Sequence, residues 1–437
     1  MNDTFTGRRA AIMGTGALLA ASTLPAGAQP QPRRQRQGNG PGNSLGFDRD
    51  RLARIGTAMQ AEIERGTFAG AVTLIARHGE IVHFDAHGFQ DAAKTRRMPR
   101  DAIFLQASMT KPMTSALAMM LVEEGRLKLD DPIAVHLPEL RDLKLEVTRD
   151  GQTETVAPAR QPIVHDLLRH TAGFVYAEAS PSATIREAYR SNNIEARDSA
   201  ITGDEMLRRL GTIPLAFQPG THFFYSIGVD VLGLLVQRVA GQRLDRVLDE
   251  RLTGPLGMRD TEWFVPEAKR SRIAEALDAD PLKAGMWNSY RILTDQRETS
   301  YLKGGAGLVS TAADYIRFAQ MIANGGSYQG RRYLAAPVVN FMLSNHTQGM
   351  GGSPTSSTGP GYGFGLGFAV RLQDGMGTTP GSEGDAMWAG AWGTSFTIDR
   401  AEELVAIIMT QGPSTRTRSR MIWKDLVYGA MVESMRR

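Results

Sequence analysis

Residues 104–112 read FLQASMTKP and place an S-x-x-K tetrad, Ser108 to Lys111, where an irregular segment turns into an amphipathic helix. A helix advances about 3.6 residues per turn, so positions i and i+3 share one face and Lys111 can reach back to the Ser108 hydroxyl. Pro112 is tolerated only near a first helical turn, which predicts a helix start close to Ser108, and Gly125 predicts its end. The spacing indicates a serine nucleophile with a lysine partner.

Two interpretations of this tetrad stay open on spacing alone. Ser108 is either an ordinary helix N-cap or a nucleophile, and a nucleophilic serine needs a neighbouring base to take its proton. An amine serves as that base only where its pKa is depressed, which the positive end of a partly buried helix favours. A second tetrad, Ser300 to Lys303, runs into a glycine-rich segment that breaks any helix, so we interpret Ser300 as a loop residue.

The N-terminal 46 residues differ in composition from the rest. Arg8 and Arg9 precede an Ala/Gly-rich apolar run and a small-x-small cleavage site, Ala26-Gly27-Ala28. This pattern predicts a signal peptide over residues 1–28, compatible with twin-arginine export, and a flexible linker over residues 29–46. The apolar run is short and no later stretch could span a bilayer, so we expect an exported, periplasmic or secreted protein without a stable membrane anchor.

Composition excludes several function classes. Residues 1–46 hold five arginines and one aspartate, which leaves 45 basic and 45 acidic side chains elsewhere and no electrostatic reason to expect a nucleic-acid partner. The absence of cysteine excludes disulfides, a thiol nucleophile and a thiolate metal site. His83 and His87 are spaced i, i+4 in a strand-like stretch, where we expect them to face solvent or a satisfied core, so we predict no metal.

Hydrophobic periodicity predicts an α/β (α+β) domain over residues 47–437. A helix over Asp48–Arg65 precedes two strands, and further strands and a closing helix return near the C-terminus. The late elements are strands at Gly363–Val370, Ala386–Trp388, Ser395–Asp399 and Leu404–Met409 and a helix at Arg420–Met435. We therefore expect one mixed antiparallel sheet flanked by helices, built from about 47–115 and 305–437, and a helical subdomain from about 116–304.

Four segments together resemble a known family: FLQASMTKP at 104–112, DLLRHTAGF at 166–174, FQPG at 217–220 and GAGLVST at 305–311. They are similar, in the same order, to motifs of the class C β-lactamase-related serine hydrolases, and within these to the family VIII carboxylesterases. The resemblance extends from about Phe47 to the C-terminus. It implies a β-lactamase/transpeptidase-like fold, catalysis at Ser108 and no cofactor.

The resemblance also implies a tyrosine that faces the serine and the lysine, and Tyr225 of Tyr225-Ser226-Ile227 matches it. A phenol titrates near pH ~10 in water, so it becomes a useful base only when a positive charge stabilises its phenolate. Lys111 and Tyr225 would then share one proton, with Tyr225 as base toward Ser108 and later as acid. Without the resemblance, Tyr225 is interpreted as a half-buried aromatic before an N-cap serine.

The third matching element is Trp388-Ala389-Gly390, where β-lactamases carry a cationic residue, a hydroxyl residue and a glycine. The resemblance implies that the Ala391 N–H pairs with that of Ser108 as an oxyanion hole, while Gly390 permits close backbone approach. Ile227 stands where the family has an asparagine, and Trp388 stands in place of the cation. Both replacements line the site with apolar surface, worth roughly 1.5–3 kcal/mol per fully buried side chain, and favour a neutral ester.

These observations predict a serine carboxylesterase that hydrolyses a small-molecule ester through a Ser108 acyl-enzyme. The alternatives within enzymes are a β-lactamase or D-Ala-D-Ala carboxypeptidase, and an acyltransferase that resolves the acyl-enzyme with an alcohol. The alternative outside enzymes is an inactive ligand-binding module of the same fold. Oligomeric state, natural substrate and acyl-chain preference stay open.

Overall fold

The computed structural model describes residues 43–195, 201–286 and 301–436. The predicted signal peptide, most of the predicted linker and Ser300 lie outside these residues. The last part of that linker is described: β1 (Asn43–Ser44) and β2 (Phe47–Asp48) pair as a short antiparallel hairpin. Gly46, between the two strands, accepts backbone hydrogen bonds from Val432 and Glu433, so the hairpin lies against the end of the chain.

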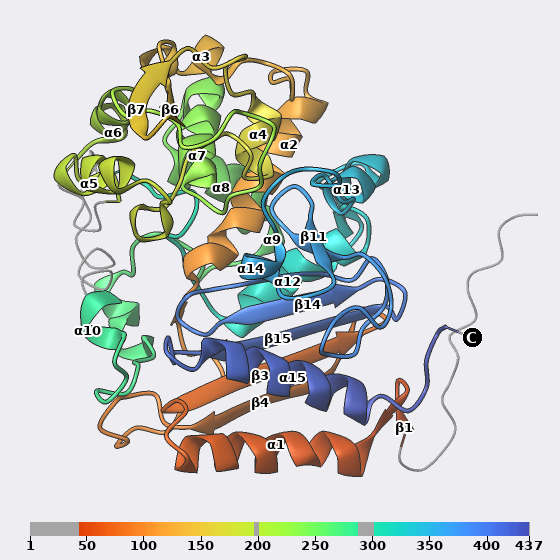
Figure 1. The fold of residues 1–437 in the computed structure, drawn as a ribbon. Helices are drawn as coiled ribbons and strands as arrows, with labels where there is room; N and C mark the ends of the chain where they lie inside the picture. The colour runs from red at the N-terminus through yellow and green to blue at the C-terminus, as the bar shows by residue number, and fades with distance from the viewer. Residues whose placement is uncertain (1–42, 196–200, 287–300, 437) are drawn as a thin grey trace, which may run out of the picture. The chain divides into compact units, whose positions relative to one another are not determined.

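A seven-stranded sheet, ordered β11-β12-β13-β14-β15-β3-β4, forms the centre of the fold (Figure 1). Every neighbouring pair of strands is antiparallel. The strands are β3 (Gly70–Arg77), β4 (Glu80–Gly88), β11 (Tyr362–Phe364), β12 (Ala369–Arg371), β13 (Ala386–Ala389), β14 (Ser395–Asp399) and β15 (Leu404–Thr410). Because β15 pairs with β3 along its whole length, both ends of the chain build one sheet, as predicted.

Helices cover both faces of this sheet. α1 (Arg49–Glu64) and α15 (Arg416–Ala430) pack together on one face, and α12 (Ala312–Ala323) packs against β3, β14 and β15 on the other (Figure 1). α1 begins where the Asp48 side chain accepts the Arg51 N–H at 2.9 Å. The predicted sheet with flanking helices is confirmed.

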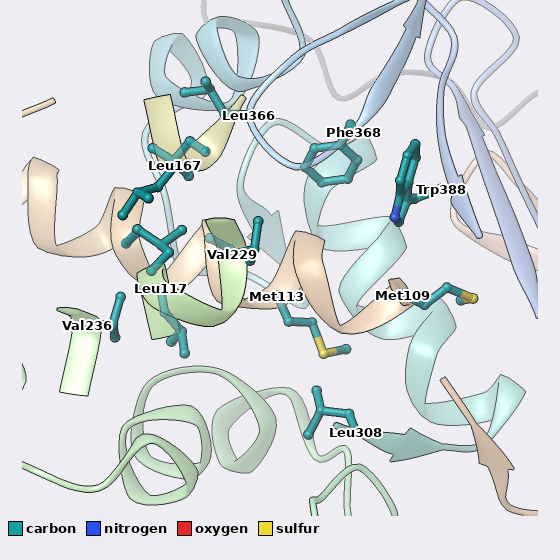
Figure 2. Packing of buried hydrophobic residues seen from close by; sticks show 14 of the residues in the cluster. Met109, Met113, Leu117, Leu167, Val229, Val236, Leu308, Leu366, Phe368 and Trp388 are labelled. Atoms are coloured by element: carbon teal, nitrogen blue, oxygen red, sulfur yellow. The ribbon is translucent and has the colours of Figure 1, made fainter. Parts of the chain in front are cut away.

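The segment between β4 and β11 is mainly helical and centres on α2 (Thr110–Glu123) and α7 (Gly228–Ala240). These two helices pack against each other through apolar side chains, and Figure 2 shows Met113 and Leu117 of α2 near Val229 of α7. All three side chains are fully buried, and each contributes roughly 1.5–3 kcal/mol on the usual scale of apolar burial. This core holds the start of α2, with Ser108 just before it, in a fixed position.

The other α-helices of the described residues are α3 (Ile133–His136), α4 (Val164–Leu168), α5 (Ala183–Ser191), α6 (Gly203–Leu210), α8 (Leu244–Leu248), α9 (Gly254–Leu256), α10 (Lys283–Met286), α13 (Ala336–Met342) and α14 (Thr355–Thr358). The remaining strands are β5 (Phe104–Leu105), β6 (Leu145–Arg149), β7 (Gln152–Val156), β8 (Val309–Ser310), β9 (Ser327–Tyr328) and β10 (Arg331–Arg332). Within the described ranges, no helix combines the length and the apolar character needed to cross a membrane.

One strand differs from its prediction. The sequence predicts a single strand over Gly363–Val370, but the structure divides this stretch into β11 and β12. Gly365 donates its backbone N–H to the Phe368 carbonyl, and Gly367 has φ +91°. These residues make a tight turn that the run of apolar side chains conceals.

Candidate active site

Ser108 occupies a sharp bend between a strand and a helix. It is the middle residue of a 3₁₀ turn, Ala107–Met109, between β5 and α2, and it is the only residue of 102–121 that is not buried. Ala107 has φ +43°, a left-handed conformation that costs a non-glycine residue on the order of 1–3 kcal/mol and is concentrated at functional sites. The bend presents a single hydroxyl from an otherwise buried segment.

The structure brings Ser108, Lys111 and Tyr225 together. The Tyr225 hydroxyl donates to Ser108 Oγ at 2.7 Å, and Lys111 Nζ donates to the same oxygen at 3.3 Å. Lys111 is fully buried, and its Nζ lies 4.7 Å from the centroid of the Tyr225 ring. One serine oxygen thus contacts both an amine and a phenol, the two groups that proton transfer to and from it would need.

Lys111 is held by two further acceptors. Its Nζ donates to the Gly305 carbonyl at 2.8 Å and to the Tyr176 hydroxyl at 3.1 Å. Gly305 in turn donates its N–H to the buried carboxylate of Asp230 at 3.1 Å, in the first turn of α7. Burial raises the pKa of Tyr176 well above its usual range, and Tyr225 acts in the same direction, so Tyr176 offers Lys111 a neutral hydroxyl.

His170 packs against the proposed base. Its ring centroid lies 4.6 Å from that of Tyr225, and its Nδ1 accepts the Ser226 N–H at 3.3 Å, which assigns the ring proton to Nε2. Burial holds the pKa of His170 well below its usual range, and the charge of Lys111 adds to this effect. A neutral imidazole therefore fixes the position of the tyrosine ring without competing with it for a proton.

The residues after β13 lie beside the serine bend. Gly390 packs on the chain just before Ser108, and a Cβ at this position would overlap the Gln106 carbonyl oxygen. Ala391 belongs to the same apolar cluster as Ala107. Among the described residues, none accepts a hydrogen bond from the Ala391 N–H. This amide is therefore left without an acceptor in the described structure, and its assignment as an oxyanion donor stays a prediction.

The two apolar replacements named by the sequence have different surroundings. Trp388 is 4% exposed, and its ring centroid lies 5.4 Å from that of Tyr225 and 5.1 Å from that of Phe364. Ile227 is the N-cap residue of α7 and is 3% exposed within the main core. Both side chains are thus almost completely covered, and they differ in what they pack on: Trp388 packs directly on the candidate base, whereas Ile227 packs within the main core.

Sequence reasoning missed the side chains that hold the reacting groups in place. Neither Tyr176 nor Asp230 has a spacing that would have predicted its role. Tyr176 contacts Lys111, and Asp230 contacts Gly305, only because the tertiary fold brings these distant segments together. His170 lies within the motif DLLRHTAGF at 166–174, and its φ of +59° marks a strained position. The signal available in the sequence was the histidine itself, inside a motif that resembles the family.

This chain is similar in sequence and in fold to several known proteins. Residues 55–429 match the protein family described as Beta-lactamase. Esterase EstB of Burkholderia gladioli is 32% identical over 376 residues, which cover 82% of this chain and 90% of EstB. Lovastatin esterase of Penicillium rubens is 28% identical over 376 residues, covering 80% and 90%. The solved structure of EstCE1, described as a hydrolase with promiscuous acyltransferase activity, has a TM-score of 0.71 and 28% identity, covering 87% of this chain and 99% of EstCE1.

Proposed function

This chain belongs to the beta-lactamase family, in agreement with the resemblance of its motifs, and we propose that it acts as a serine carboxylesterase on neutral esters. One observation carries the proposal above all others. Ser108 Oγ accepts hydrogen bonds from both Tyr225 and Lys111, at 2.7 Å and 3.3 Å. A ligand-binding module has no use for this complete arrangement, whereas acyl transfer through serine requires it.

In the proposed acylation, Ser108 Oγ bonds to the ester carbonyl carbon while its proton passes to the phenolate oxygen of Tyr225. This step starts from the form in which the proton shared by the two groups lies on Lys111, so that its positive charge stabilises the phenolate. The N–H groups of Ser108 and Ala391 hold the negative oxygen of the tetrahedral intermediate. When the bond to the alcohol oxygen breaks, Tyr225 gives its proton to the leaving oxygen, and an acyl-enzyme remains on Ser108.

Deacylation repeats these steps with water. A water oxygen bonds to the acyl carbon and its proton passes to Tyr225; the bond to Ser108 Oγ then breaks, and Tyr225 returns the proton to the serine. The carboxylic acid leaves and the enzyme regains its starting state. Apart from the ester and water, the proposed sequence uses only side chains and backbone groups of this chain.

The side chain that packs on Tyr225 supports a particular class of substrate. A cation at position 388 would attract a carboxylate, and Trp388 presents an indole there instead, which favours a neutral ester with an apolar acyl or alcohol part. The likeness to EstB and to lovastatin esterase supports an ester over a β-lactam.

The test is hydrolysis of p-nitrophenyl butyrate by the purified protein and by its Ser108→Ala variant, with a chromogenic cephalosporin as second substrate. Ser115→Ala is the matched control, because Ser115 lies in α2, is fully buried and has an Oγ without a hydrogen-bond partner in the described part of the chain. We expect ester turnover in the wild type and the control and none in Ser108→Ala. Efficient cephalosporin cleavage would favour a β-lactamase, and no Ser108-dependent turnover of either substrate would favour the binding module.

Acyl transfer to an alcohol is the second candidate function. The likeness to EstCE1, a hydrolase with promiscuous acyltransferase activity, favours it. Adding an alcohol to the same assay separates the two outcomes, because transfer forms a new ester that chromatography detects.

Export is proposed from the N-terminal sequence alone. The support is the arginine pair at Arg8 and Arg9 and the small residues at 26–28.

A further inference from the structure

Arg420 of α15 contacts the peptide group that follows β13. Its Nη2 donates to the Gly390 carbonyl oxygen at 2.5 Å. That carbonyl and the N–H of Ala391 belong to the same peptide group, so Arg420 binds one end of the unit whose other end is the proposed oxyanion donor. The Gly393 N–H donates to the same carbonyl at 3.0 Å and restricts the peptide further.

The guanidinium of Arg420 lies in surroundings unfavourable to a charge. Burial lowers the pKa of Arg420 to about 10, and the neighbouring Arg416 acts in the same direction, whereas Tyr225 acts against them. Arg420 has no carboxylate partner within the described residues, and its buried Nε has no hydrogen-bond partner there. Arg420 is only partly buried, but a cation that lies partly out of water without a carboxylate partner is still unfavourable, so packing of α15 alone gives no reason for an arginine at this position.

We propose that Arg420 is a positioning residue of the oxyanion site, which holds and polarises the Gly390–Ala391 peptide so that the Ala391 N–H donates more strongly to the transition state. A hydrogen bond accepted by a peptide carbonyl strengthens the N–H of the same peptide, and the effect grows where water is excluded. Because the negative oxygen develops only in the transition state, Arg420 acts on kcat and leaves substrate binding unchanged. This inference rests on the proposed function.

The first experiment compares Arg420→Ala with Arg416→Ala, a matched control that removes a cation one turn away on the same helix. For Arg420→Ala we expect kcat to fall about ten- to hundredfold, less than the 10²–10³-fold that follows removal of an oxyanion donor itself. KM should stay within about twofold, because ground-state binding is unaffected. The affinity for a boronic acid, which forms a tetrahedral adduct on Ser108, should fall by the same factor as kcat. Arg416→Ala should keep both values.

The second experiment uses the cavity that Arg420 borders. This cavity has a volume of about 330 Å³ and is lined in part by Arg420, Met387 and Met421, and Met421 is 40% exposed, so the cavity reaches the surface. Truncation to alanine enlarges it by the volume of the arginine side chain. Ethylguanidinium should enter and restore part of the kcat of Arg420→Ala, whereas ethylammonium, which lacks the planar set of donors, should not.

A merely structural role for Arg420 makes different predictions. If Arg420→Ala is folded and binds the boronic acid as tightly as the wild type, the proposal is overturned; loss of activity that ethylguanidinium does not restore overturns it as well. Should Arg420→Ala fail to fold, Arg420→Lys carries the same test, with a smaller fall in kcat and in boronic acid affinity expected. Boronic acid binding requires Ser108 but no ester turnover. If the wild type does not hydrolyse esters, the proposed esterase function is refuted. The boronic acid affinities of the wild type and of Arg420→Ala then still test the role of Arg420.

Discussion

Among single residues, Lys111 owes its position to a buried carboxylate that it does not contact. Asp230 accepts the Gly305 N–H at 3.1 Å, and the Gly305 carbonyl accepts from Lys111 Nζ at 2.8 Å. Burial raises the pKa of Asp230, although the charges of Lys111 and Lys303 act in the opposite direction. The glycine is required at this link, because a Cβ at position 305 would lie 2.6 Å from Asp230 Oδ2.

Gly305→Ala therefore tests how strictly Lys111 must be placed. We expect kcat for ester hydrolysis to fall about a hundredfold, since a displacement of about 1 Å in a catalytic group costs that much. The thermal unfolding midpoint should fall far less than kcat does. The measurement is steady-state kinetics on p-nitrophenyl butyrate together with a melting curve.

Gly429→Ala is the control for this change. Gly429 lies in α15, and a Cβ there meets nothing within 4 Å, so activity should be unchanged. Unaltered kcat in Gly305→Ala would show that the link through Asp230 does not position the lysine.

Spacing alone accounts for the lysine but not for the tyrosine. The i to i+3 relation places Lys111 within 3.3 Å of Ser108 Oγ, as the tetrad predicts. Tyr225 lies 117 residues after Ser108, and only the family resemblance predicts its place in the site. The contacts of Tyr176 and Arg420 depend on how distant segments pack, which no local pattern encodes.

Among the elements, α1 and α15 are joined through the carboxylate of Glu62. This residue of α1 is 4% exposed and accepts from Arg418 Nε and Nη2 at 2.8 Å each, and from Thr67 at 2.7 Å. The bonds from Arg418 are the main reason why the pKa of Glu62 is lowered to about 2, and burial acts against them. Its folded-state pKa thus lies below the ordinary value of 4.5.

Glu62→Gln should lower the free energy of unfolding by roughly 1–2 kcal/mol at pH 7, a discounted value because water screens the half-exposed Arg418. The carboxylate stabilises the fold fully above pH 4.5, and this contribution is lost as the pH falls toward 2. The difference between wild type and variant should shrink over that range. Urea unfolding followed by tryptophan fluorescence measures it.

A difference that stays constant from pH 7 to below pH 4 would contradict this account. Glu178→Gln serves as the control, because Glu178 pairs with Arg190 at the surface and both side chains are more than half exposed. We expect no measurable change in unfolding for this control.

Element existence was easier to predict than element ends. The sequence predicts a closing helix over Arg420–Met435, whereas α15 begins four residues earlier and ends at Ala430. Val432 and Glu433 donate their N–H groups to the Gly46 carbonyl instead of continuing the helix. The partner lies at the other end of the chain, so no periodicity near residue 430 signals the end of the helix.

In the whole molecule, Arg77 joins the two ends of the described chain. It is 1% exposed in β3, and it donates to the Leu45 carbonyl at 3.2 Å, to the Glu433 carbonyl at 2.7 Å and to Glu402 Oε2 at 3.0 Å. Arg77→Met should destabilise the fold by about 3–5 kcal/mol, because it leaves the buried Glu402 carboxylate without its cation. Urea unfolding measures this loss.

Arg149→Met is the matched control, since the Arg149 side chain is 71% exposed and its ion pair with Glu154 lies in solvent. We expect no measurable loss there. Equal stability of Arg77→Met and the wild type would mean that the chain ends are held by the sheet alone.

The pairing of β3 with β15 also has a consequence for folding during synthesis. The ribosome completes β3 at Arg77 but reaches the start of β15 about 330 residues later, a delay of roughly 15–65 seconds at ordinary elongation rates. Throughout that interval β3, which is buried along its whole length in the finished protein, has one edge without its partner strand. The yield of folded protein should therefore depend on how well the cell shields that edge until the last strand arrives.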